Sequence, residues 1–107
     1  MSESEQQQFI YIIRPTRPEM LSTGLNEREA ELVDRHFLYL QNLTSEGTAL
    51  LVGRTLNTDP SAFGVVIYKA ESHRQALKIM AADPAISGGV MTGEMFPYKI
   101  VMHSLDG

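Results

Sequence analysis

Short apolar runs alternate along the chain with longer segments of helical spacing. Residues 9–13, 48–54 and 64–70 are apolar and rich in β-branched or aromatic side chains, and each run is typical of a strand. We expect the first strand to be buried on both faces and to end at Arg14-Pro15. Because two prolines exclude a helix from residues 14–18, we expect that segment to form a loop.

Two segments carry the signals of helices. Asn26 and Glu29 have the spacing of a capping box, and apolar residues then recur at intervals of three and four, which predicts a helix from about Glu27 to Glu46. A second helix begins after Ser72 and must end before Pro84.

The last apolar run completes a recognisable order of elements. Residues 90–102 alternate imperfectly and contain Gly93 and Pro97, which predicts a long strand with a bulge or an edge position near Pro97. The turn-rich segment 57–61 predicts an antiparallel hairpin between the second and third strands. The order βαββαβ indicates an α+β, ferredoxin-like fold: a four-stranded antiparallel sheet with two helices on one face. Because the other face then lacks a cover, we expect a homodimer whose sheets face each other as a dimeric α/β barrel.

Composition narrows the class of protein. The chain has 107 residues, no Cys, and 13 acidic against 9 basic side chains. We expect a single domain over residues 9–107 after a disordered lead-in at residues 1–8. The absence of Cys excludes disulfides, thiolate metal sites and Cys nucleophiles. The net charge of −4 argues against nucleic acid and membrane surfaces as partners, and the polar N-terminus is unlike a signal peptide, so we expect a cytoplasmic protein.

One histidine and one aspartate are the best candidates for catalysis. His36 lies on or beside the apolar stripe of the first helix, and Asp83 follows the second helix. In a ferredoxin-like fold the end of the second helix lies near the start of the first, so the two side chains can meet. A carboxylate bonded to one imidazole nitrogen fixes the tautomer and makes the other nitrogen a better base. The alternatives are a structural histidine in the core and an Asp-Pro turn that ends the helix.

Three arginines are candidates for binding a substrate. Arg14 and Arg17 flank the loop after the first strand and Arg54 ends the second strand, so together they could bind an anionic or carbonyl-bearing small molecule. The alternative, strongest for Arg17, is a solvated surface residue. His73 and His103 lack metal-ligand spacing, and no phosphate-binding loop or dinucleotide fingerprint is present, so we expect neither a metal nor a cofactor.

The sequence resembles the YciI-like (YCII-related) family from Phe9 to Val101. The resemblance rests on the order and spacing of seven features: Arg14-Pro15, the segment His36-Phe-Leu-Tyr-Leu, Gly47 before an apolar strand, Gly53, Ala81-Ala-Asp-Pro84, Gly89-Val90, and Glu94 with Pro97. It implies the ferredoxin-like fold, the dimeric barrel and a His and Asp pair, which maps onto His36 and Asp83. The family often has an aromatic residue where this chain has Ala85 and Gly-Pro where it has Gly53-Arg54. Both departures would open the site, and the second adds charge.

Three functions fit these observations. The first is a small-molecule enzyme, a cofactor-independent lyase or isomerase, in which the dyad performs proton abstraction, elimination or isomerisation beside a carbonyl or ring hydroxyl. The second is a homodimer that binds a small ligand without catalysis. The third, by analogy of fold alone, is a cofactor-independent oxygenase of the dimeric α/β barrel type.

Overall fold

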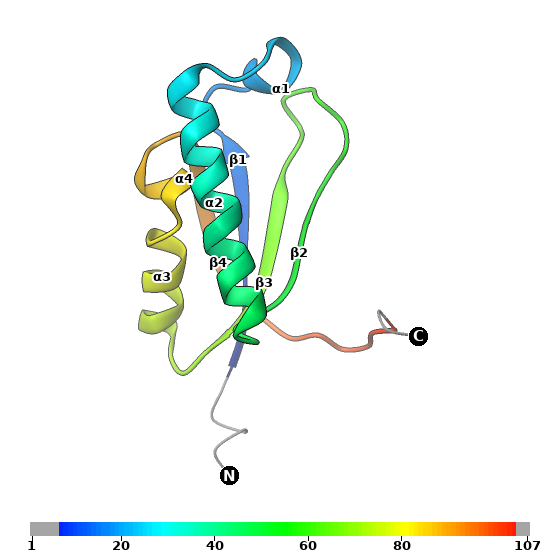
Figure 1. Ribbon diagram of the computed structural model, residues 1–107. Helices are drawn as coiled ribbons and strands as arrows, with labels where there is room; N and C mark the ends of the chain where they lie inside the picture. Colours follow the sequence, from blue (N-terminus) through cyan, green and yellow to red (C-terminus); the bar gives the residue numbers. More distant parts are fainter. Residues whose placement is uncertain (1–6, 105–107) are drawn as a thin grey trace.

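Helices cover one face of a single antiparallel sheet in the computed structural model, which describes residues 7–104 (Figure 1). The elements in chain order are β1 (Gln7–Pro15), α1 (Met20–Thr23), α2 (Glu27–Ser45), β2 (Ala49–Arg54), β3 (Gly64–Ala70), α3 (His73–Ala81), α4 (Pro84–Ser87) and β4 (Met91–Tyr98). The strand order is β2-β3-β1-β4, and every neighbouring pair is antiparallel. This is the ferredoxin-like arrangement that the sequence predicts.

Strand β1 lies in the middle of the sheet and has one face in the core. Phe9, Tyr11 and Ile13 point to the helix side and are buried, whereas Ile10 and Ile12 on the opposite side are only half-buried. The prediction that this strand is buried on both faces is therefore wrong for the single chain, because α2 and α3 both pack on the same side of the sheet (Figure 1).

The face of the sheet without helices carries more apolar than polar side chains; the polar ones are Gln8, Arg14, Lys69, Thr92 and Glu94. The strand registers place seven apolar side chains on it, which we call the open face: Ile10, Ile12, Leu51, Val65, Ile67, Phe96 and Tyr98. Phe96 and Tyr98 are each 42% exposed. A contiguous apolar surface on a small domain is typical of an interaction site.

The first strand is longer than predicted at both ends. Gln7 and Gln8 belong to β1, so the strand begins within the expected lead-in, of which residues 1–6 lie outside the described part of the chain. At the other end β1 continues through Pro15, which pairs with Met91 of β4. A proline is tolerated there because β3 stops pairing at Ile13, so no backbone N–H is needed on that side. The expected loop is correspondingly shorter and runs into the single turn of α1.

The last strand is shorter than predicted. It ends at Tyr98 instead of residue 102, and its last pair with the neighbouring strand β1 is Gln8–Tyr98. The expected edge position near Pro97 is confirmed. The register shift that the sheet does contain lies in β2, between Ala49 and Leu51.

The helix boundaries follow the capping signals. Asn26 accepts a hydrogen bond from the backbone N–H of Glu29, whose carboxylate accepts from the N–H of Asn26, so the predicted capping box starts α2. Ser72 caps α3 as expected. The short helix α4 was not predicted, although Asp83 as its N-cap and Pro84 in its first turn are the preferred residues at those positions.

Candidate functional site

The side chains of His36 and Asp83 are in direct contact inside the protein. Nδ1 of His36 lies 2.8 Å from Oδ1 and 2.9 Å from Oδ2 of Asp83. Only 3% of His36 and none of Asp83 is exposed. The predicted pair is therefore formed, between the middle of α2 and the residue that starts α4.

Local structure fixes the carboxylate of Asp83. As the N-cap of α4, Asp83 accepts a hydrogen bond of 2.9 Å from the backbone N–H of Ala85. The hydroxyl of Tyr11 donates a second hydrogen bond, of 2.7 Å, from β1. The predicted alternative for Asp83, an Asp-Pro turn, thus coexists with the contact to His36: the same carboxylate caps a helix and holds the imidazole.

These donors determine which nitrogen of His36 is available. Burial, reinforced by the neighbouring Asp83, raises the pKa of Tyr11 far above its ordinary value, so its hydroxyl remains a donor. With Asp83 accepting from Tyr11 and Ala85, Nδ1 of a neutral His36 is the nitrogen that carries hydrogen and Nε2 keeps its lone pair. Among residues 7–104, Nε2 has no hydrogen-bond partner.

His36 borders a cavity of about 340 Å³ between α2 and the hairpin of β2 and β3. Its walls are mainly apolar and include Phe37 and Phe63. The bordering polar residues besides His36 are Arg54, Thr55, Asn57 and Thr58, all from the end of β2 and the loop after it. A cavity of this kind, with few polar groups and one imidazole, is suited to a small organic ligand.

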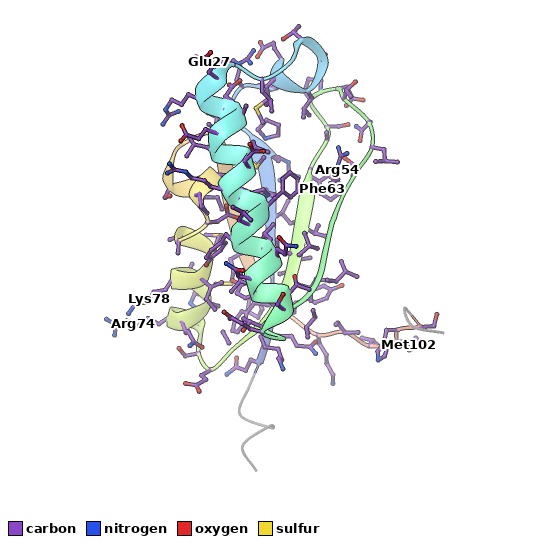
Figure 2. All side chains as sticks on the ribbon, in the orientation of Figure 1. Glu27, Arg54, Phe63, Arg74, Lys78 and Met102 are labelled. Carbon is purple, nitrogen blue, oxygen red and sulfur yellow. The ribbon has the colours of Figure 1, made fainter. Side chains whose placement is uncertain are left out.

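Of the three predicted arginines, only Arg54 borders this cavity. Figure 2 labels Arg54 beside Phe63 near the end of the hairpin, and the register places Arg54 on the helix side of the sheet, opposite Gly64. Arg14 projects from the other side of β1 and lies over the ring of Phe63, with its guanidinium carbon 5.5 Å from the ring centre. Arg14 therefore lies against a residue that borders the cavity but does not border the cavity itself.

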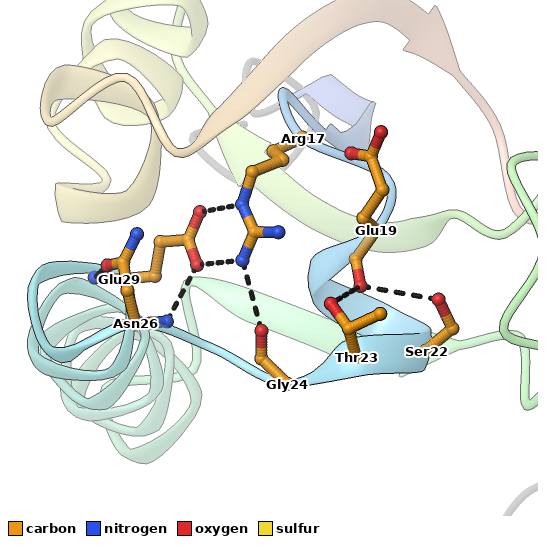
Figure 3. A network of polar contacts seen from close by, with 7 residues as sticks. All are labelled: Arg17, Glu19, Ser22, Thr23, Gly24, Asn26 and Glu29. Atoms are coloured by element: carbon orange, nitrogen blue, oxygen red, sulfur yellow. Dashed lines mark hydrogen bonds and ion pairs between the residues drawn. The ribbon is translucent and has the colours of Figure 1, made fainter.

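Arg17 is occupied by contacts near the start of α2. Its guanidinium donates to both carboxylate oxygens of Glu29, at 2.8 and 2.6 Å, and to the carbonyl of Gly24 at 3.0 Å (Figure 3). Glu29 is buried, and the hydrogen bonds from Arg17 and then from the backbone of Asn26 lower its pKa to about 2. These contacts favour a structural role for Arg17.

Two features of the site were missed at the level of sequence. The pattern of the first apolar run predicts Tyr11 only as part of a strand; the signal for its role is that a buried tyrosine hydroxyl needs a hydrogen-bond partner. Thr55, Asn57 and Thr58 border the cavity, yet the sequence predicts only a turn over residues 57–61 and carries no signal that this loop borders a cavity.

No group of three or more His, Asp or Glu side chains within residues 7–104 has the arrangement of a metal site. None of the helices in the same part of the chain is both long and apolar enough to cross a membrane.

A known protein family matches most of the chain. The YCII-related domain matches residues 8–98, which include His36, Asp83 and every strand except the first residue of β1. A comparison with the curated proteins returns no match.

Several solved structures share the fold. A 5-chloro-2-hydroxyhydroquinone dehydrochlorinase from Burkholderia phenoliruptrix, in complex with 2,5-dihydroxybenzoquinone, is 21% identical and superposes with a TM-score of 0.61 over 85% of this chain and 93% of its own. An uncharacterised protein from Thermotoga maritima is 12% identical, with a TM-score of 0.54 over 88% and 99%. A protein of unknown function from Nitrosomonas europaea is 16% identical, with a TM-score of 0.51 over 94% and 95%.

Proposed function

The chain belongs to the YCII-related domain family, and on that premise we propose that it is a small-molecule enzyme in which His36 acts as general base or acid and Asp83 orients its ring. The observation that carries the proposal is the geometry of the pair. One ring nitrogen is held by a buried carboxylate, while the other has no partner in the described chain and belongs to a residue that borders a cavity.

The proposed chemistry is a proton transfer beside a carbonyl or ring hydroxyl. Nε2 of His36 accepts a proton from the substrate, and Asp83 stabilises the imidazolium that forms while Nδ1 keeps its hydrogen. In an isomerisation, the electron pair left on the substrate takes the proton back at another atom. In an elimination, that pair forms a new double bond while a leaving group departs with its bonding pair. Neither route needs a covalent intermediate.

The likeness to the dehydrochlorinase favours elimination among these reactions. That enzyme was solved with 2,5-dihydroxybenzoquinone, a ring that carries hydroxyl and carbonyl groups. For this chain we propose a substrate of similar size, because a cavity of about 340 Å³ has room for one substituted ring: an apolar cavity of about 150 Å³ suffices for benzene.

Variants of the dyad test the proposal. Halogenated hydroquinones and small enolisable carbonyl compounds would be screened with the purified protein, following product, halide release and oxygen uptake. We expect His36→Gln and Asp83→Asn to lower turnover by about 10²- to 10⁴-fold. The exposed His103, changed to Gln, is the matched control and should leave turnover unchanged. Full turnover in both dyad variants would disprove the mechanism, and saturable binding without product would favour the non-catalytic alternative.

We also propose that the protein forms a homodimer through the open face. Two chains related by a twofold axis would bury the same seven apolar side chains on each side, from all four strands of the sheet. A self-complementary apolar surface is what such an isologous contact requires.

A further inference from the structure

The charge of the cavity differs in sign from the charge of the whole chain. The protein carries a formal charge of −4. Yet the residues that border the cavity include one permanent cation, Arg54, and no Asp or Glu. Arg54 itself is exposed, so its charge lies at the rim of this largely apolar cavity. A cleft with charge of one sign and low-dielectric walls concentrates small ions of the opposite sign.

The guanidinium of Arg54 is available for such an anion. No carboxylate within residues 7–104 forms an ion pair with it, whereas Arg17 and Arg35 each have one. The acidic residue of the adjoining loop, Asp59, does not border the cavity, and its carboxylate accepts hydrogen bonds from Asn57 and Ser61 of its own turn. Arg54 is therefore the charged group that an entering ligand meets.

The remaining walls indicate what the rest of the ligand is like. Phe37 and Phe63 both border the cavity although they are 54% and 36% exposed, so each offers an aromatic surface that the chain itself does not fully cover. The guanidinium of Arg14 lies over the ring of Phe63, with its carbon 5.5 Å from the ring centre. Apolar walls with a single cation at the rim are complementary to a flat or compact apolar body with one anionic group.

We propose that the site selects a compact organic anion with an apolar body, and that Arg54 is the specificity residue that binds its negatively charged oxygens. A guanidinium can donate two parallel hydrogen bonds to a carboxylate or a similarly delocalised oxyanion. As a statement about substrate class, the inference rests on the proposed function, since it assumes that this cavity is where His36 meets its substrate. The binding preference itself requires no turnover and is tested separately.

Benzoate and benzamide are suitable probes, because they share a ring and differ in charge. Titration of the full-length protein, followed by backbone amide NMR shifts, should show both ligands at residues 53–58 and 63–65. We expect benzoate to bind about tenfold more tightly, the factor associated with one charge-assisted hydrogen bond. Arg54→Leu should abolish this preference. Arg74→Leu, which removes the same charge from an exposed position on α3 (Figure 2), should preserve it.

Several results of these titrations would overturn the inference about Arg54. Equal affinity for the two probes, a preference unchanged in Arg54→Leu, shifts located elsewhere, or no binding of either probe would overturn the inference. A preference lost equally in Arg74→Leu would do the same, because the effect would then come from the net charge of the chain. His36→Gln separates the two proposals: we expect it to retain the preference for benzoate. If that variant loses turnover while Arg54→Leu leaves the preference intact, the dyad stands and the anion site fails.

Discussion

The hydroxyl of Tyr11 donates a hydrogen bond of 2.7 Å to Oδ2 of Asp83, across 72 positions of sequence. This bond joins the central strand of the sheet to the residue that holds His36. Asp83 is thereby held from three sides, by β1, by α2 and by the first turn of α4. The orientation of the imidazole depends on the packing of the whole domain as well as on the dyad.

Replacing Tyr11 with Phe should disturb the dyad while leaving the core filled. The variant removes a donor to a charged acceptor, and we expect a loss of about 1.5 to 3 kcal/mol in the free energy of unfolding. The imidazole NMR signals of His36 should also shift, because Asp83 keeps only two of its donors. The matched control is Tyr68→Phe. That buried hydroxyl donates to the carbonyl of Ala76 at the same distance of 2.7 Å, and its loss should leave the His36 signals unchanged. Equal shifts in the two variants would contradict the positioning role of Tyr11.

The two roles of Asp83 can be separated by the choice of substitution. Asn is as good an N-cap as Asp, so Asp83→Asn should keep α4 and cost little of the capping energy. Asp83→Ala loses the cap as well as the contacts with Tyr11 and His36. Its free energy of unfolding should be at least about 1 kcal/mol lower than that of Asp83→Asn. Denaturant titrations of both variants measure the difference. Identical stabilities would show that the capping hydrogen bond contributes nothing.

Local signals in the sequence account for the parts of the fold that were predicted well. The capping box of Asn26 and Glu29 depends on residues three positions apart, and the predicted helix differs from α2 by one residue. The contact between His36 and Asp83 was predictable for a different reason: the βαββαβ order by itself brings the two helices to one face of the sheet.

The parts that were predicted poorly depend on neighbours distant in sequence. The ends of β1 and β4 depend on which residues of the neighbouring strands they pair with, and no pattern within either strand carries that information. The bond from Tyr11 to Asp83 and the residues that border the cavity are likewise decided by tertiary packing. The sequence makes all three arginines candidates for binding a substrate and separates only Arg17, as the one with the strongest surface alternative, whereas the structure gives each a different surrounding.

Stability should depend on pH through Glu29. Its pKa is lowered from 4.5 to about 2 by the hydrogen bonds from Arg17 and the backbone of Asn26. A carboxyl whose pKa is lower in the folded state stabilises that state above its unfolded pKa, and this contribution is lost as the pH falls through the folded pKa. Glu29→Gln should therefore be less stable than the natural chain at neutral pH, and the difference should shrink between about pH 4.5 and pH 2.

Denaturant titrations at several pH values check this dependence. Glu31→Gln is the control, because Glu31 forms an exposed pair with Arg35, one turn along the same helix. Exposed pairs contribute little, so this variant should follow the natural chain at every pH. The contrary result is a free energy of unfolding for Glu29→Gln that differs from that of the natural chain by the same amount down to pH 2. That result would show that the Arg17–Glu29 pair does not act through ionisation.

A charge on the open face should prevent dimer formation. Phe96 lies on the edge strand β4, opposite Ile10 of β1, and 42% of it is exposed in the single chain, so Glu at this position is compatible with the folded subunit. In a dimer the same substitution would place two carboxylates in an apolar contact, where burying unpaired charge is costly. Sedimentation velocity should therefore find a dimer for the natural chain and a folded monomer for Phe96→Glu. Leu38→Glu, on the outer side of α2 where the side chain is 60% exposed, controls for the added charge and should remain dimeric. A natural chain that sediments as a monomer, or a Phe96→Glu variant that stays dimeric, would show that the open face is not the dimer contact.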